Sequence, residues 1–147
     1  MAESKTNKGI STELKFFSYC LDNDIVVCQP VTTDTPYDCI FEGKSGRLYK
    51  AQLKTGYRPA KVKNQKDQNV FTYSTRTSHF SKDGVTSHGY TKGQIDGFVT
   101  YFNELPDMFF YIPIELSKKG SMRIYFGDKP TAQSNYYKDF LLDFSKL

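Results

Sequence analysis

The sequence predicts an α/β or α+β domain that is built around a central β-sheet. Three patterns lead to this fold class: an amphipathic helix near the N-terminus, a series of apolar or alternating segments typical of strands, and a second helical pattern near the C-terminus. The chain has 147 residues, of which 38% are hydrophobic and 24% charged, and these values fit one compact globular domain. We therefore expect residues 1–147 to form a single domain, with residues 1–9 flexible.

The first expected element is a helix over residues 11–22, where a Ser or a Thr can cap the N-terminus. Leu14, Phe17 and Leu21 recur at i, i+3 and i+7, which predicts that these side chains form the stripe facing the core. Glu13 lies at the border of that stripe, in the first turn, where a carboxylate also favours the helix dipole.

Apolar and alternating segments predict seven strands in the rest of the chain. They comprise residues 25–28, 38–42, 47–55, 70–77, 95–102, 108–114 and 122–126. Residues 78–93 are polar and contain an Asp-Gly turn, so we expect a long loop or the tip of a hairpin there. Aromatic and apolar residues at helical spacing over residues 136–144 predict a C-terminal helix.

The segment over residues 38–55 gathers polar side chains at one place. A Gly-containing turn at residues 43–46 joins two expected strands, so that Asp38 at the start of the first comes close to the end of the second. Successive side chains of a strand point to opposite faces, and Gln52 and Lys54 therefore share a face. We expect Asp38, Gln52 and Lys54 to lie together.

These residue types suit metal-assisted hydrolysis of a phosphodiester. Mg²⁺ prefers carboxylate and carbonyl oxygens, which Asp38, the Gln52 side chain and the Leu53 backbone can supply. Lys54 can orient or deprotonate the attacking water and stabilise the developing negative charge, and Glu13 can add a second carboxylate. The competing interpretation is structural: Asp38 caps a turn, and the other polar residues lie on a solvated sheet face.

The charge of the chain is segregated. Residues 43–66 contain eight basic residues and no acid, whereas the whole chain has 20 basic and 16 acidic residues. A basic segment next to a phosphodiester-cleaving site favours a nucleic-acid partner over a solvated loop. The expected DNA contacts in and after this segment are Arg58, Lys61, Lys63, Gln65, Lys66 and Gln68, with a second cluster of Arg76, His79 and Lys82. Lys118 and Lys119 are further basic residues, for which solvated surface is the default interpretation.

Other classes of protein are disfavoured. No apolar run approaches the roughly 20 residues of a membrane span, and the N-terminal residues lack the apolar stretch of a signal peptide. The three cysteines and two histidines match no zinc-site spacing, and we expect Cys20, Cys28 and Cys39 to be buried thiols. These features indicate a cytoplasmic protein that associates with the nucleoid through DNA and does not bind membranes.

The order and spacing of several short motifs resemble the PD-(D/E)XK nuclease superfamily. The motifs are Gly9-x-x-x-Glu13, Tyr37-Asp38 and Gln52-Leu53-Lys54-Thr55, followed by similarities over residues 71–76, 93–98 and 110–113. Within the superfamily, the chain most resembles small endonucleases of bacterial group I introns, which tend to have Gln-x-Lys where relatives have an acid. Two departures from the common pattern are Tyr37 in place of Pro and the neutral Gln52, which removes a negative charge from the site.

The resemblance implies a restriction-endonuclease-like core, with a mixed β-sheet flanked by helices. It also implies cleavage of both strands of duplex DNA with Mg²⁺, or with Mn²⁺ as a substitute, and the homing of a group I intron. The neutral Gln52 leaves open a non-cleaving DNA-binding protein on a decayed nuclease fold. A resolvase-type or splicing-type nuclease that acts on branched DNA or RNA is a further alternative.

A single domain of this size covers little duplex, so we expect a homo-oligomer, either a dimer or a tetramer. The apolar strands near residues 95–114 and the aromatic C-terminus are candidates for the interface. Their alternative role is ordinary core packing.

Overall fold

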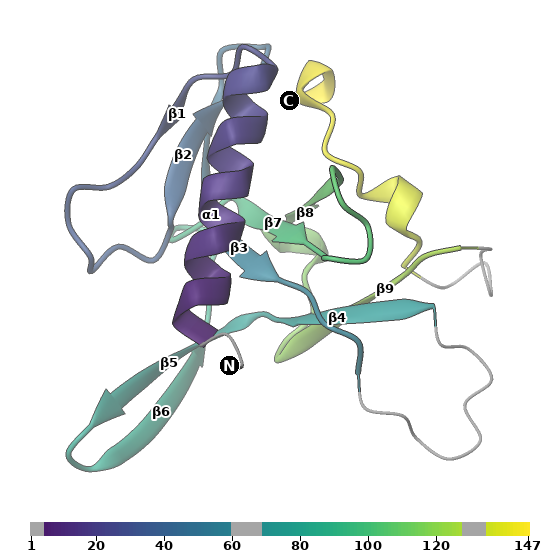
Figure 1. The fold of residues 1–147 in the computed structure, drawn as a ribbon. Coiled ribbons are helices and arrows are strands. Elements are labelled where there is room, and N and C mark those ends of the chain that lie inside the picture. Colours follow the sequence, from purple (N-terminus) through teal and green to yellow (C-terminus); the bar gives the residue numbers. More distant parts are fainter. Residues whose placement is uncertain (1–4, 60–68, 128–134) are drawn as a thin grey trace.

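The computed structural model describes residues 5–59, 69–127 and 135–147. Figure 1 shows one long helix that lies across a central sheet, a second strand pair below this sheet in the view, and a hairpin that projects from the molecule near the N-terminal end of the helix. This arrangement is an α+β fold, as the sequence predicted.

The central sheet has five strands in the order β1-β2-β3-β7-β8. β3 and β7 run parallel, and the other neighbouring strands pair antiparallel. The sheet is therefore mixed, which confirms the expectation drawn from the family resemblance. The strands are β1 (Val27–Cys28), β2 (Cys39–Glu42), β3 (Leu48–Thr55), β7 (Gly97–Tyr101) and β8 (Phe109–Pro113).

Two smaller strand pairs complete the described structure. β4 (Val70–Ser74) pairs with β9 (Ser121–Tyr125), and β5 (Arg76–Ser81) pairs with β6 (Gly84–Gly89) in the projecting hairpin. The expected strand over residues 70–77 is thus divided at Thr75, whose hydroxyl donates to the Lys118 carbonyl at 2.8 Å. The polar segment after it forms the hairpin, which was one of its two expected structures.

Helix α1 (Lys5–Asp22) begins earlier than the sequence predicted, and residues 5–9 belong to it. The predicted core stripe was wrong, because Leu14 and Leu21 are 63% and 68% exposed. Phe16 and Cys20 are fully buried against the sheet instead. The helix carries two apolar rows on different faces, and only one of them can face the sheet.

The core has two layers, one on each face of the central sheet. The first joins α1 to β2, β3 and the C-terminal segment, and contains Phe16, Phe41 and Leu53. The second joins β7 and β8 to the β4–β9 pair, and contains Phe71 and Phe98. All residues of β7 are buried, since both faces of this strand are covered.

The expected C-terminal helix is absent from the described residues. Two short 3₁₀ turns, η2 (Tyr137–Asp139) and η3 (Phe144–Lys146), flank an extended stretch that pairs with the edge of β8. The Tyr111 amide donates to the Phe140 carbonyl at 2.8 Å, and the Leu142 amide donates to the Phe109 carbonyl at 2.9 Å. Pairing with this edge provides hydrogen-bond partners for the backbone N–H and C=O groups. It also divides the apolar side chains between the two core layers, whereas a helix would direct them to one side.

In the part of the chain that the structure describes, one α-helix flanks the mixed sheet that the resemblance implied. Within the described residues, α1 is the α-helix, it covers one face, and a third 3₁₀ turn, η1 (Ile114–Leu116), follows β8. None of the helices in this part of the chain combines the length and the hydropathy that crossing a membrane requires.

Cys20 and Cys39 are buried thiols as expected, but Cys28 is exposed.

Candidate active site

The β2–β3 hairpin brings Asp38 beside the second half of β3. The strands pair from Glu42 opposite Leu48 to Cys39 opposite Ala51, and the Asp38 amide donates to the Ala51 carbonyl at 2.9 Å. The turn closes through Gly46, which has a φ of 88° that few other residues adopt readily. Pairing with β2 ends at this point, and β3 continues with one open edge.

Asp38 is fixed to that open edge by its side chain. Its Oδ2 atom accepts a hydrogen bond from the Leu53 amide at 2.8 Å. In an antiparallel ladder, the N–H and C=O groups of one strand residue point to the same edge, so the Leu53 carbonyl also faces the side where Asp38 lies. The carboxylate of Asp38 and the carbonyl of Leu53, both of them proposed metal ligands, thus belong to one edge of β3.

Gln52 and Lys54 lie on the face of β3 that is opposite to α1. Tyr49, Ala51 and Leu53 are buried in the layer beneath the helix, and the half-buried residues between them point the other way. The predicted alternation along this strand is therefore confirmed. The face with Gln52 and Lys54 is directed toward the base of the β5–β6 hairpin.

The ammonium of Lys54 is held at the base of the hairpin. Its Nζ donates to the Arg76 carbonyl at 2.9 Å and lies 5.5 Å from the centre of the Tyr90 ring. Burial lowers the pKa of Lys54, and the negative charge of Asp38 opposes this shift. A Lys with a lowered pKa releases its proton more readily, which is a property required of a group that activates water.

Both acids of the predicted site hold their protons more tightly than exposed carboxyls. Burial raises the pKa of Asp38, against the opposing effects of the Leu53 amide and the Lys54 charge. Burial also raises the pKa of Glu13, and the nearby charge of Asp38 raises it further. A cation between two such acids would favour their charged forms.

Glu13 approaches Asp38 from α1, on the other side of the sheet from Gln52. The neighbouring Thr12 is buried, and its hydroxyl makes a 2.7 Å hydrogen bond with the hydroxyl of Thr55, which fixes α1 to the end of β3. Glu13 and Asp38 line a pocket of about 210 Å³. The structure therefore brings Glu13 to Asp38 rather than directly to Gln52.

A larger cleft, of about 670 Å³, lies on the Gln52 side of Asp38 and extends to the hairpin. Tyr90 and His88 line it together with Asp38 and Gln52. Sequence reasoning missed Tyr90 and gave His88 no role, since both lie far from the β2–β3 hairpin in sequence. Tyr90 packs edge-on against Phe98 with ring centres 5.4 Å apart, and the Asp-Gly turn in this polar segment was the available sign of a hairpin that could bring Tyr90 back toward β3.

The oxygen atoms at this site fit a hard divalent cation. In the described ranges, no cluster of three or more His, Cys, Asp or Glu residues is arranged for metal binding. The predicted set of Asp38, Gln52 and Leu53 draws instead on one carboxylate, one amide and one backbone carbonyl, which are ligands that Mg²⁺ accepts alongside water. Glu13 is the second carboxylate within electrostatic reach of Asp38.

The expected DNA contacts are placed only in part. Arg58 forms a bidentate ion pair with Glu104, at 2.6 Å from Nε and 2.5 Å from Nη2, and its guanidinium lies 5.2 Å from the centre of the Phe126 ring. Arg76 starts β5 and donates to the Ser87 carbonyl across the hairpin at 3.0 Å. Lys82 is exposed at the hairpin turn, and His79 belongs to β5. Outside the described residues lie Lys61, Lys63, Gln65, Lys66 and Gln68.

A second cleft, of about 450 Å³, lies at the base of the hairpin and is rich in basic residues. Arg76, Lys118 and Lys119 line it, and Tyr90 borders both this cleft and the one beside Asp38. Three cations in one concave surface form a favourable environment for phosphate groups. Lys118 and Lys119, which the sequence left as solvated surface by default, thus share a cleft with Arg76.

Residues 3–143 match the family model described as PD-(D/E)XK endonuclease. Because this match extends over most of the chain, the protein belongs to the PD-(D/E)XK endonuclease family and is a nuclease by class. Among solved structures, the fold is similar to that of a bacterial homing endonuclease, I-Ssp6803I. The TM-score is 0.75 at 20% identity, and the alignment covers 95% of this chain and 89% of that chain. A search of curated proteins found no match.

Proposed function

We propose that this protein is a site-specific endonuclease that hydrolyses both strands of duplex DNA, with Mg²⁺ as its cofactor and Mn²⁺ as a substitute. The observation that carries this proposal is the convergence of Asp38, Leu53 and Lys54 at one end of β3. The Asp38 carboxylate is bonded to the Leu53 amide at 2.8 Å, and Lys54 lies close enough for the two charges to shift each other's pKa.

In this proposal, Asp38, the Gln52 side chain and the Leu53 carbonyl hold the metal ion, and Glu13 adds a second carboxylate from α1. When bound, the metal supplies positive charge to the scissile phosphate and lowers the pKa of a water molecule. The Leu53 amide keeps the Asp38 carboxylate directed toward the open edge of β3. The Thr12–Thr55 hydrogen bond holds Glu13 near it.

Lys54 orients the attacking water or accepts its proton, and stabilises the negative charge that develops on the phosphate. The lowered pKa of Lys54 supports the first role, and the position of its ammonium 5.5 Å from the Tyr90 ring, which lines the cleft, supports the second. The Arg76 carbonyl and the Tyr90 ring restrict where the ammonium can lie, so the group is already ordered in the absence of DNA.

The DNA backbone would lie across the cleft beside Asp38 and along the projecting hairpin. Arg76, Lys118 and Lys119 line the basic cleft on that side, and Lys82 is exposed at the hairpin turn, so these cations would contact phosphates. A two-stranded ribbon such as β5–β6 can enter the major groove, where side chains read base edges. Arg58 would have to exchange its Glu104 partner for a phosphate in order to contribute.

The biological role that we propose is the homing of a group I intron in a bacterium, performed by a homo-oligomer in the cytoplasm. Its support is the fold similarity to a structure described as that of a bacterial homing endonuclease. Two copies would supply one active site for each DNA strand. The sequence suggested the strands near residues 95–114 as an interface. Their side chains Phe98, Phe110 and Ile112 are fully buried and belong to the core of one chain.

One observation favours a second candidate function. Gln52 is neutral, and Asp38 and Glu13 border a pocket that Gln52 does not line. A protein with too little negative charge to hold a metal would bind DNA without cleaving it.

Incubation of the protein with supercoiled plasmid DNA separates the two functions. The nuclease proposal predicts nicked and linear products with Mg²⁺ or Mn²⁺, and none with EDTA or with the Asp38→Asn variant. Tight binding in a mobility-shift assay without products in either metal would instead support the non-cleaving protein. Parallel reactions on a four-way junction and on structured RNA test whether linear duplex is the preferred substrate.

A further inference from the structure

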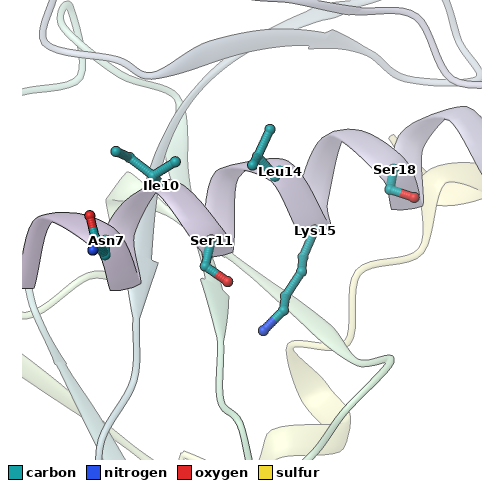
Figure 2. A pocket seen from close by; sticks show the side chains of 6 residues that line it. All are labelled: Asn7, Ile10, Ser11, Leu14, Lys15 and Ser18. Carbon is teal, nitrogen blue, oxygen red and sulfur yellow. The ribbon is translucent and has the colours of Figure 1, made fainter. Parts of the chain in front are cut away.

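The side of α1 that faces away from the core carries a row of apolar side chains, which we call the outer stripe: Ile10, Leu14, Phe17 and Leu21. Ile10, Leu14 and Leu21 are 49%, 63% and 68% exposed, and Phe17 is partly buried. Figure 2 shows Ile10 and Leu14 on one side of the helix and Lys15 on the other. Large apolar side chains gathered on one face in this way mark interaction surfaces.

The fold of the described chain uses this stripe only at Phe17, which packs against the core beneath the helix. Thr12, Phe16 and Cys20 already form the face that packs on the sheet, at i, i+4 and i+8, and all three are buried. The outer stripe is a second apolar face on the same helix. A helix with two apolar faces is suited to packing between two partners, of which the sheet is one.

The spacing of the stripe is the same in both directions along the helix. Consecutive members of the stripe, from Ile10 to Leu21, are separated by four, three and four residues. Two copies of α1 packed antiparallel across a two-fold axis therefore place Ile10 opposite Leu21 and Leu14 opposite Phe17, in both halves of the interface. Such self-complementarity is what a symmetric dimer interface requires.

The charges at the two ends of α1 favour the same antiparallel partner. The first turn has no acid and the last turn has no base, so neither end has the charged residues that usually stabilise a helix dipole. Lys8 is exposed near the N-terminal end, and Asp22 and Asp24 are exposed at the C-terminal end. An antiparallel copy brings the basic end of one helix beside the acidic end of the other.

Small residues beside the stripe leave room for a second helix. Ser11 and Ser18 lie along its border, and together with Ile10 and Leu14 they line an open pocket of about 420 Å³ (Figure 2). Short side chains at this position allow two helices to approach within the usual 8–10 Å. The larger cleft with Gln52 lies on the opposite face of the sheet, so a partner on α1 leaves that cleft accessible.

We propose that the outer stripe of α1 is a self-association surface, on which a second copy of this chain docks with its own α1 antiparallel. This inference specifies the surface used by the proposed homo-oligomer, and it does not depend on DNA cleavage. It also replaces the strands near residues 95–114, one of the two interfaces that the sequence had suggested, since the apolar side chains of these strands are buried.

Sedimentation velocity without DNA tests the surface. The wild-type chain, of 16.9 kDa, is expected to sediment with at least twice that mass. Leu14→Lys is expected to reduce the mass to that of one chain, and the control Leu116→Lys, at a side chain that is 58% exposed on η1, is expected to leave it unchanged. Circular dichroism checks that both variants are folded. A monomeric wild type, or a Leu14→Lys variant that keeps the wild-type mass, would overturn the proposal.

Disulfide trapping tests the orientation of the two helices. In a Cys28→Ser background, which removes the exposed native thiol, Ile10→Cys and Leu21→Cys variants are mixed and oxidised. Antiparallel packing predicts a covalent dimer in the mixture and little in either variant alone, whereas cross-linking of Ile10→Cys with itself would contradict that orientation. A dimer that forms through the stripe but does not cleave DNA would refute the proposed function and leave this inference standing.

Discussion

Replacing Asp38 with Asn separates the contribution of its charge from that of its hydrogen bond. In the wild type, Oδ2 of Asp38 accepts a hydrogen bond from the Leu53 amide at 2.8 Å. The side-chain oxygen of Asn can still accept this hydrogen bond. The substitution removes a negative charge that burial makes unfavourable, because burial raises the pKa of Asp38 in the folded protein. We therefore expect Asp38→Asn to be more stable than the wild type without metal, although it no longer cleaves DNA.

The matched variant Asp38→Ala removes the hydrogen bond as well as the charge. It leaves the Leu53 amide without this acceptor beside a half-buried site, and an unpaired donor of this kind costs about 1–3 kcal/mol. Asp38→Asn is accordingly expected to exceed Asp38→Ala by that amount in the free energy of unfolding. Urea denaturation in EDTA, followed by circular dichroism, measures both differences.

The pH dependence of stability provides a second readout for the same variant. Below the ordinary carboxyl pKa, the folded and unfolded chains both hold the Asp38 proton. As the pH rises from there to the raised pKa of the folded state, the unfolded chain loses its proton first, and the wild type becomes less stable. Asp38→Asn should lack this part of the decline. An Asn variant that is less stable than the wild type, or equal to the Ala variant, would refute the reasoning.

Two further substitutions test the contacts that position the site. Tyr90→Leu removes the ring that lies 5.5 Å from Lys54 Nζ and should lower kcat by about tenfold at unchanged DNA affinity. Tyr90→Phe keeps the ring and should keep most of the rate. Equal rates for the two variants would show that the Tyr90 ring does not position Lys54. Thr12→Val breaks the 2.7 Å hydrogen bond to Thr55 and should lower the free energy of unfolding by about 1 kcal/mol. Valine keeps the branched shape of threonine, so the wild type is the reference, and a Thr12→Val variant as stable as the wild type would contradict this role.

The parts of the fold that local patterns determine were predicted well from the sequence. The alternation along β3 depends on strand geometry alone, and it placed Gln52 and Lys54 on one face as the structure has them. The turn before β3 likewise predicted that Asp38 would come close to the end of β3, where its side chain now accepts a hydrogen bond from the Leu53 amide. Both inferences involve residues that one hairpin connects.

The errors arose where tertiary packing selects among local possibilities. Phe140 and Phe144 do have helical spacing, but the backbone between them forms hydrogen bonds with the edge of β8 and is therefore extended. Helix α1 has two apolar faces, and its sequence does not say which one meets the sheet, so the predicted core stripe was centred on the row of Leu14 rather than on the row of Phe16. Tyr90 reaches Lys54 only because the β5–β6 hairpin folds back toward β3, a contact between segments 36 residues apart in sequence.

The central claim is that Lys54 takes part in phosphodiester hydrolysis, and comparing it with Lys50 tests this most directly. Lys50 lies on the same face of the same strand, and its Nζ also donates to a backbone carbonyl, that of Gly93, at 2.8 Å. We predict that Lys54→Ala lowers the rate of Mg²⁺-dependent plasmid cleavage by about 10²–10³-fold while DNA binding persists, and that Lys50→Ala cleaves at nearly the wild-type rate. Equal cleavage by the Lys54→Ala variant and the wild type would contradict the account.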